Sequence, residues 1–336
     1  MGWKPTPSEQ LKIDWLNLSL PIHYHKPIIL ILTQAPYMLT VETLKARYTN
    51  DRWGARLGVE PLAWRESPRA LEVSLPYRAS NMNMSGRTHG GMLASFLHDA
   101  AKLLVWGQSE QDTDPLPQTL DFQISYLTGG GREALTAVAE LSRRTREFSF
   151  VAVEGRNEAG TAIARAHVVF RNAPSGAAVS HPNQPEGALP ALPHPSDAAT
   201  SRFAPMVKLF NQAMGRAHPG CITEWMGDGL CLMRQEIIPE QDDWAGQVAP
   251  GQILTLLDNT GGGAGCSLAT DLGMAVTLSI QTAFCEPATG EALVAHAQSL
   301  RREDGLTHNL VQIFGADSLR LKAFGTMTHL VRPGKR

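Results

Sequence analysis

The stretch Thr119–Arg144, TLDFQISYLTGGGREALTAVAELSRR, occurs a second time in the chain as Thr277–Arg302, TLSIQTAFCEPATGEALVAHAQSLRR. The two segments align without a gap, and ten of their 26 positions are identical. Similarity at this level between the two halves of one chain indicates an internal duplication. The repeat therefore predicts two domains of one kind.

Each half has the same order of expected elements. An early strand region, 69–75 in the first half and 230–238 in the second, leads to an apolar helix that starts with glycine. In the first half, strands with alternating apolar residues follow at 148–154 and 162–170. One buried helix followed by antiparallel strands is an α+β plan in which the sheet wraps the helix.

The two glycine-started helices are expected to be buried. The first runs from Gly90 to about Trp106 and is apolar on most of its circumference, and the second runs from Gly251 to about Ala269. A helix that is apolar all round has to be covered on several sides. We therefore expect the two helices to lie antiparallel beside each other under one continuous sheet.

Composition sets the expected domain boundaries. Residues 1–37 contain prolines and no sustained periodicity, so they are expected to be a poorly structured N-terminal extension. A helical pattern capped by Thr40 begins the first domain, 38–172. Residues 173–202 are rich in Pro, Ala, Ser and Gly and are expected to be a linker, which leaves 203–336 as the second domain.

Composition also excludes several function classes. A chain of 336 residues that is 43% hydrophobic can bury a substantial core, and a formal net charge of -2 with scattered Lys and Arg argues against nucleic-acid binding. The four cysteines form no C-x-x-C pair, and no clustered His predicts a metal site. The apolar run at 27–32 is too short to span a bilayer and lacks the flanks of a signal peptide. No membrane partner and a cytoplasmic location are expected.

The segment Asn83–Gly91, NMSGRTHGG, is followed by an apolar helix and then by TLDFQISY at 119–126. This arrangement resembles the hot-dog acyl-CoA thioesterases of the phenylacetate-pathway type. The duplication, with an Asp, Thr and Gln set in the second half, is also similar to the double-hot-dog acyl-CoA thioesterase II group. The resemblance covers most of residues 55–172 and 225–331. It implies a double hot-dog fold, an intramolecular pseudo-dimer of two antiparallel sheets that each wrap a central helix.

The resemblance also implies one composite active site between the halves. In this family a carboxylate on the central helix of one domain activates water, and a backbone N–H at the helix N-terminus of the other domain, here Gly90, stabilises the charge that develops on the thioester oxygen. Asp258 holds the acidic position, in an apolar helix where a carboxylate is costly to bury without partners or a function. In the expected site, residues of the first half face residues of the second half: Asn83, His89, Gly90 and Gly91 face Asp258, Thr277 and Gln298.

Four of these residues also fit a purely structural role. Asn83 fits a stabilised turn, and His89 fits a cap on the loop. Thr277 fits a strand position, and Gln298 fits a strand position that faces outward.

The reciprocal pairing is expected to be degenerate. Pro250 stands in the register of Gly90 and has no N–H to offer an oxyanion. His98 stands at the position of Asp258, and Asp99 follows one residue later, about 100° further around the helix. The set expected at this second site is His98, Asp99, Thr119, Glu140 and Pro250.

Four arginines recur at matching strand ends, where guanidinium groups are candidates to bind the phosphates of coenzyme A: Arg143, Arg144, Arg301 and Arg302. A solvated strand end is the alternative explanation, and the pattern favours it. Coenzyme A is expected only as part of the substrate, and no separate cofactor is expected.

Three functions remain open on the sequence. The first is an acyl-CoA thioesterase that uses activated water and no covalent intermediate, because no Gly-x-Ser-x-Gly segment supplies a nucleophile. The second is a hydratase or dehydratase of an acyl thioester, which needs an acid and a histidine working together, and His98 or His296 is the candidate histidine. The third is a non-catalytic acyl-thioester binding module, which the departures at Pro250 and His98 keep open. The expected partner is an acyl-CoA or another acyl thioester, and a homodimer of such chains is a further possibility.

Overall fold

The computed structural model describes residues 38–65, 69–108, 116–172, 192–243, 245–269 and 274–332. All of these belong to a single unit, Pro36–Arg336. The expected N-terminal extension, 1–37, and most of the expected linker, 173–191, lie outside the described residues.

Helices and strands in the first half follow the expected order. They are α1 Val41–Tyr48, α2 Arg52–Leu57, β1 Glu60–Arg65, β2 Ala70–Leu75, the short 3-10 helix η1 Ala79–Asn81, α3 Gly90–Gly107, β3 Gln118–Tyr126, β4 Leu135–Arg144, β5 Phe148–Asn157 and β6 Ala162–Arg171. Thr40 caps α1 as the sequence predicts, because its hydroxyl accepts a hydrogen bond from the Thr43 N–H.

The second half repeats this order. Its elements are α4 Asp197–Ala217, β7 Cys221–Gly227, β8 Leu230–Gln235, η2 Pro239–Gln241, α5 Pro250–Cys266, β9 Met274–Phe284, β10 Leu293–Glu303, β11 Leu306–Gly315 and β12 Leu321–Arg332. Helix α4 already begins at Asp197, so the last residues of the segment expected as a linker, 173–202, are helical.

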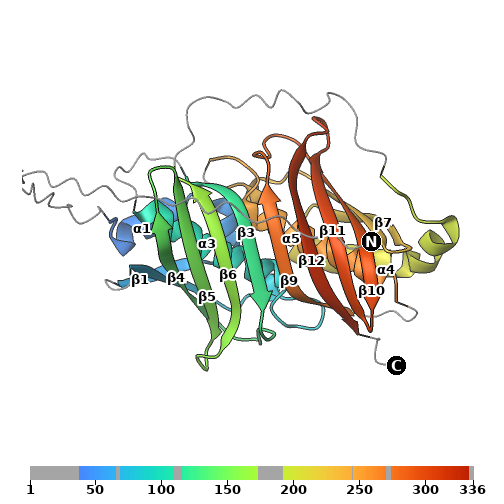
Figure 1. Ribbon diagram of the computed structural model, residues 1–336, viewed down its shortest axis with the longest axis horizontal. Coiled ribbons are helices and arrows are strands. Elements are labelled where there is room, and N and C mark those ends of the chain that lie inside the picture. Colours follow the sequence, from blue (N-terminus) through green and yellow to red (C-terminus); the bar gives the residue numbers. More distant parts are fainter. Residues whose placement is uncertain are drawn as a thin grey trace, which may run out of the picture. The chain divides into compact units, whose positions relative to one another are not determined.

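The twelve strands of the described residues form one antiparallel sheet with the order β1-β2-β4-β5-β6-β3-β9-β12-β11-β10-β8-β7, so the two sheets implied by the resemblance are continuous. Figure 1 shows these strands in one layer, with α3 behind the strands of the first half and α5 behind those of the second. The halves join where β3 pairs with β9. Gln123 and Gln281, which the sequence repeat superposes, are direct partners in this pair. The fold is therefore α+β, and its two halves meet about the centre of the repeated strand.

The two central helices lie side by side and antiparallel, as expected. Ser95 of α3 donates a hydrogen bond of 2.5 Å from its hydroxyl to the carbonyl of Gly251 at the start of α5. One turn earlier in α3, a Cβ added to Gly91 would stand 2.6 Å from the Cα of Thr255, which lies one turn later in α5. The contacts run in opposite order along the helices, and the approach at Gly91 leaves room only for glycine.

A buried charged cluster fastens α1 and α2 to α3. The ammonium of Lys102 lies 2.7 Å from Asp51 and 3.2 Å from Asp99, and the Tyr48 hydroxyl donates a 2.6 Å hydrogen bond to Asp99. Burial would lower the pKa of Lys102, but the two carboxylates raise it above its ordinary value. Asp51 also caps α2 by accepting from the Gly54 N–H. The cluster replaces water around three buried charges.

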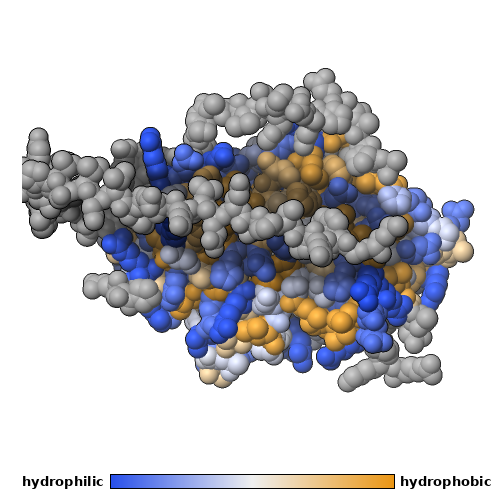
Figure 2. Space-filling view, viewed as in Figure 1, coloured by the Kyte–Doolittle hydropathy of each residue, from blue (hydrophilic) through white to orange (hydrophobic). Residues whose placement is uncertain are grey.

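The outer surface mixes polar and apolar side chains. On the face seen in Figure 2, hydrophilic residues (blue) and hydrophobic residues (orange) are both visible, each in several groups. No helix in the described ranges is long and apolar enough to cross a membrane.

Removing the Lys102 ammonium from the buried charged cluster should destabilise the fold strongly. In Lys102→Met, the carboxylates of Asp51 and Asp99 stay buried without their partner, and breaking a buried ion pair in this way costs about 3–5 kcal/mol. Denaturant unfolding followed by circular dichroism measures the change. The exposed Lys208 in α4 provides the matched control, because Lys208→Met should stay within about 0.5 kcal/mol of wild type. Equal stability of the two variants would contradict the role given to the cluster.

Candidate active site

Asp258 lies in the middle of α5, and its carboxylate is bound by both halves of the chain. The side chain is 5% exposed. The backbone N–H of Gly91, at the start of α3, donates a 2.7 Å hydrogen bond to Oδ2. The hydroxyl of Thr277, on β9, donates a 2.7 Å hydrogen bond to Oδ1. The carboxylate therefore joins α3, α5 and the sheet at one point.

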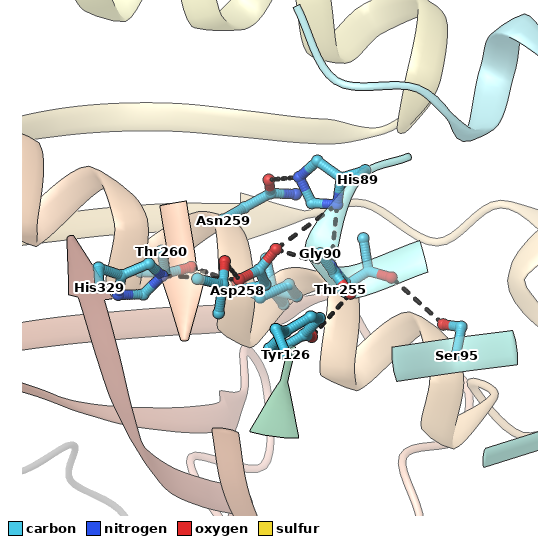
Figure 3. A network of polar contacts seen from close by, with 12 residues as sticks. His89, Gly90, Ser95, Tyr126, Thr255, Asp258, Asn259, Thr260 and His329 are labelled. Atoms are coloured by element: carbon cyan, nitrogen blue, oxygen red, sulfur yellow. Dashed lines mark hydrogen bonds and ion pairs between the residues drawn. The ribbon is translucent and has the colours of Figure 1, made fainter. Parts of the chain in front are cut away.

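Two imidazoles flank this carboxylate, as Figure 3 shows. His89 Nδ1 lies 3.6 Å from Oδ2, and His329 Nε2 lies 3.6 Å from Oδ1. Burial would raise the pKa of Asp258, but His329, His89 and the Thr277 hydroxyl together lower it to about 2. Asp258 is therefore a carboxylate at neutral pH.

The start of α3 supplies backbone donors beside Asp258. Gly90 is the first residue of the helix, and its N–H has no acceptor among the described residues. The Gly90 carbonyl accepts a 2.8 Å hydrogen bond from the Tyr126 hydroxyl, which fixes the orientation of this turn. A Cβ on Gly90 would stand 2.8 Å from Asp258 Oδ2 and 2.9 Å from Thr277 Oγ1. The absent side chain therefore lets the carboxylate lie close to the helix start, where the unbonded N–H stands at the positive end of the helix dipole.

A β-bulge aims Thr277 at Asp258. On β9 the inward positions are Ile280 and Thr282, so strict alternation would place Leu278 inward. The pairing with β12 skips Leu278 and sets Thr277 opposite His329. A bulge changes which side chains face the core, and here it places Thr277 inward.

His89 connects Asp258 to a second group of polar side chains. Its Nε2–H donates a 2.9 Å hydrogen bond to Asn259 Oδ1, and its Nδ1 accepts a 3.1 Å hydrogen bond from the Gly91 N–H. These partners place the proton of neutral His89 on Nε2. The ring of His218 packs edge-on against that of His89, with 4.9 Å between ring centroids. His89 is thus both the N-cap of α3 and part of the site.

His329 is the site residue that the sequence analysis missed. It is buried on β12, and its Nδ1 accepts a 3.0 Å hydrogen bond from Asn309 Nδ2, so its proton is on Nε2, which faces Asp258. The corresponding partner of Thr119 in the first half is Phe170. The signal in the sequence was that His329 stands where the first half has Phe170.

Two residues of the expected site lie elsewhere. Gln298 is exposed on β10, where Ala295 and Ala297 point inward, so the amide faces away from α5 and the expected water-holding role is wrong. The oxygen of the Asn83 side chain accepts hydrogen bonds from the Ser85 N–H, the Ser85 hydroxyl and the Arg87 N–H. Asn83 therefore stabilises its own loop, as the alternative interpretation held.

The second site is filled by protein. His98 Nε2 lies 2.8 Å from Thr119 Oγ1, and Phe122, Phe170 and Phe284 surround its ring. Burial lowers the pKa of His98, which keeps it neutral. Asp99 forms an ion pair with Lys102 in the buried charged cluster.

The start of α5 also differs from the start of α3. Pro250 begins α5 without an N–H, and the indole of Trp53 lies 2.5 Å from where a Cβ on Gly251 would stand. Glu140 is exposed on β4 and belongs to neither site, which corrects its expected position.

The four arginines lie at strand ends, as expected. Arg144 donates 3.3 Å hydrogen bonds to the carbonyl and side chain of Gln108, the C-cap of α3. Arg302 donates to the carbonyl of Leu268, just beyond α5, and Arg301 pairs with Glu303. Arg143 is exposed. Arg144 and Arg302 thus complement the negative ends of the two central helices, and phosphate binding by these arginines stays a prediction.

The arrangement combines an ionised carboxylate, an unbonded N–H at a helix start and two imidazoles within one buried cluster. A carboxylate can accept a proton from water, and the N–H can bind an oxygen that gains negative charge. No cluster of three or more His, Cys, Asp or Glu in the described ranges is arranged to hold a metal ion.

Comparison with known proteins agrees with this geometry. Residues 78–171 match the model of the acyl-CoA thioesterase N-terminal domain family. The fold is similar to that of acyl-CoA thioesterase II TesB2 from Mycobacterium marinum, with a TM-score of 0.51 and 15% identity over 88% of this chain and 99% of that one. It is also similar to that of the tesB protein of Mycobacterium avium subs. paratuberculosis, with a TM-score of 0.54 and 14% identity over 83% and 97% of the two chains.

At these identities the structural likeness shows the fold alone, and the match to a thioesterase domain is confined to residues 78–171. Among curated proteins, none matches this chain by sequence. The matched segment contains His89, Gly90, Gly91 and the whole of α3, which form the first-half side of the site. Residues 78–171 therefore match an acyl-CoA thioesterase domain, and the described part of the chain has a fold similar to those of solved acyl-CoA thioesterase II proteins.

Proposed function

We propose that the chain is an acyl-CoA thioesterase that hydrolyses its substrate by water attack at one composite site between the two halves. The observation that carries this proposal is the hydrogen bond between Gly91 and Asp258. It places a carboxylate of the second half next to the unbonded N–H of Gly90 in the first half.

The reaction needs an acceptor for the water proton and a donor for the thioester oxygen. The Asp258 carboxylate takes a proton from water as the water oxygen bonds to the carbonyl carbon. The Gly90 N–H binds the oxygen that becomes negatively charged, aided by the positive end of the α3 dipole. The carbon–sulfur bond then breaks, the thiolate of coenzyme A leaves, and the proton held by Asp258 is returned to it.

The low pKa of Asp258 bears on how much each group contributes to catalysis. A carboxylate with a pKa of about 2 is always ionised at neutral pH but is a weak base. The Gly90 donor and the placement of water therefore have to contribute to the acceleration together with the base. Thr277 holds one carboxylate oxygen, and His329 faces it from the sheet, where its Nε2–H has no hydrogen-bond partner among the described residues. We assign to His329 the water-holding role that the sequence had suggested for Gln298.

The two halves are proposed to be a pseudo-dimer of hot-dog domains, 38–172 and 203–336, in which only one of the two equivalent sites works. The direct pairing of Gln123 with Gln281 and the reciprocal contacts of α3 and α5 support the duplication. The second site lacks a carboxylate facing the helix start, lacks the N–H and is occupied by Trp53 and aromatic rings.

Hydration of an enoyl thioester is the competing reaction. The two imidazoles 3.6 Å from Asp258 favour it, because such a reaction uses a carboxylate together with a proton donor. Mass analysis of the product separates the two reactions, since hydrolysis releases free coenzyme A and hydration keeps the thioester.

Replacing the proposed base should abolish hydrolysis. Asp258→Asn keeps the shape of the side chain and its hydrogen bond from Thr277 but cannot accept the proton, so the turnover of an acyl-CoA panel, measured as thiol release, should fall by about 10²–10⁴-fold. Gln298→Ala serves as the control and should stay within about twofold of wild type, because Gln298 lies on the outer face. Unchanged turnover in Asp258→Asn would place the chemistry elsewhere.

The asymmetry of the two sites should appear in a matched pair of variants. Thr277→Val removes the hydroxyl that binds the Asp258 carboxylate, and the loss of a hydrogen bond to a charged group should lower kcat/KM about 10–100-fold. Thr119→Val makes the same change at the repeat-related position and should leave kcat/KM within about twofold, once folding is verified by circular dichroism. A larger loss in Thr119→Val would mean that the working and degenerate sites are assigned the wrong way round.

A further inference from the structure

His218 is a buried polar side chain for which the proposed mechanism has no use. It lies in the turn between α4 and β7 and is 2% exposed. Its ring packs against His89, yet neither ring nitrogen has a hydrogen-bond partner among the described residues. Burial, with further contributions from His89 and Arg56, lowers the pKa of His218 well below its ordinary value. The neutral ring therefore offers one donor and one acceptor.

Asn259, which also contacts His89, carries a second unpaired group. The residue is 6% exposed and follows Asp258 in α5. Its Oδ1 accepts the hydrogen bond from His89 Nε2, whereas its Nδ2 has no acceptor in the described part of the chain. At the repeat-related position in α3, Asp99 is fully bonded to Tyr48, His98 and Lys102.

Unpaired buried polar atoms are rare in native proteins, and a group of them beside an active site indicates that something else binds there. Here one nitrogen of Asn259 and two of His218 are unpaired, and both residues contact His89. The His89 ring also contacts Gly91 and Asp258. His89 therefore connects these unpaired nitrogens to the proposed reaction site.

We propose that His218 and Asn259 form a polar subsite that binds an uncharged hydrogen-bonding group of the substrate, next to the thioester. This inference rests on the proposed function. The group has to accept from Asn259 Nδ2 and to bond a neutral imidazole, which a hydroxyl or a secondary amide does. Among the described residues no charged side chain bonds these three nitrogens, so an uncharged group costs less to bury there than an ion does.

The bound group can come from either side of the thioester. On the acyl side it is a hydroxyl near the carbonyl carbon, and on the thiol side it is the first amide of the pantetheine arm. Both offer one hydrogen-bond donor and at least one acceptor.

His218→Phe tests the subsite, because it keeps an aromatic ring against His89 and removes both nitrogens. Since these nitrogens bond nothing in the described protein, the melting temperature should be unchanged or higher. For substrates that carry the group, kcat/KM should fall about tenfold, and for substrates that lack it the change should stay within about twofold. His218→Gln, which keeps a donor and an acceptor, should recover part of the loss and serves as the second variant.

Four probes locate the group. A 3-hydroxyacyl-CoA is compared with the acyl-CoA of equal length, and the acyl thioester of N-acetylcysteamine, which has the amide, is compared with that of propanethiol, which lacks it. A loss in His218→Phe confined to the hydroxylated substrate supports the acyl source, and a loss on every substrate except the propanethiol thioester supports the amide source. An equal effect on all four probes, including no effect, overturns the subsite.

Calorimetry separates failure of this inference from failure of the proposed function. If the wild-type chain hydrolyses none of the probes, the thioesterase proposal fails. Calorimetry then gives the dissociation constants of the four probes for wild type and for His218→Phe. The effect of the substitution is compared between probes that carry the hydroxyl or the amide and probes that lack it. A selective loss of binding still supports the subsite, and uniform binding overturns it.

Discussion

The hydrogen bond between the Gly91 N–H and the Asp258 carboxylate is the interaction on which the rest of this structure depends. It crosses from one half of the chain to the other and buries an anion at the interface of two helices. Such an anion is costly to bury, and the N–H at a helix start, the Thr277 hydroxyl and the two flanking imidazoles offset that cost. The bond requires α3 and α5 to be close and antiparallel, which in turn requires a glycine at position 91.

Duplication explains how one half-site could lose its chemistry while the fold survived. The repeat supplies two equivalent positions between the helices, and each needs to be filled to keep the core packed. At one position the chain keeps a carboxylate next to a helix start with an unbonded N–H. At the other, His98, Phe170 and Trp53 fill the space, and the Lys102 cluster binds the neighbouring Asp99. The polar groups at this second position serve stability.

The sequence predicted the elements and the pairing of the halves because both depend on local patterns and on the repeat. Asp258 could also be predicted, since a carboxylate in a helix that is apolar all round is conspicuous. His329 could not be placed, because the bulge at Leu278 decides which residue of β12 stands opposite Thr277. Gln298 was misassigned because the phase of β10 is set by its pairing with β8 and β11, which turns the alanines inward. His218 gave no signal, since its neighbours come from the other half.

The central claim is that each chain has a single working site, formed by the start of α3 and the middle of α5. The stoichiometry of binding tests this claim most directly. Calorimetric titration of the wild-type chain with a non-hydrolysable thioether analogue of an acyl-CoA should give one equivalent bound per chain, because Pro250 and Trp53 close the second position. Two equivalents per chain with similar affinity would contradict the account.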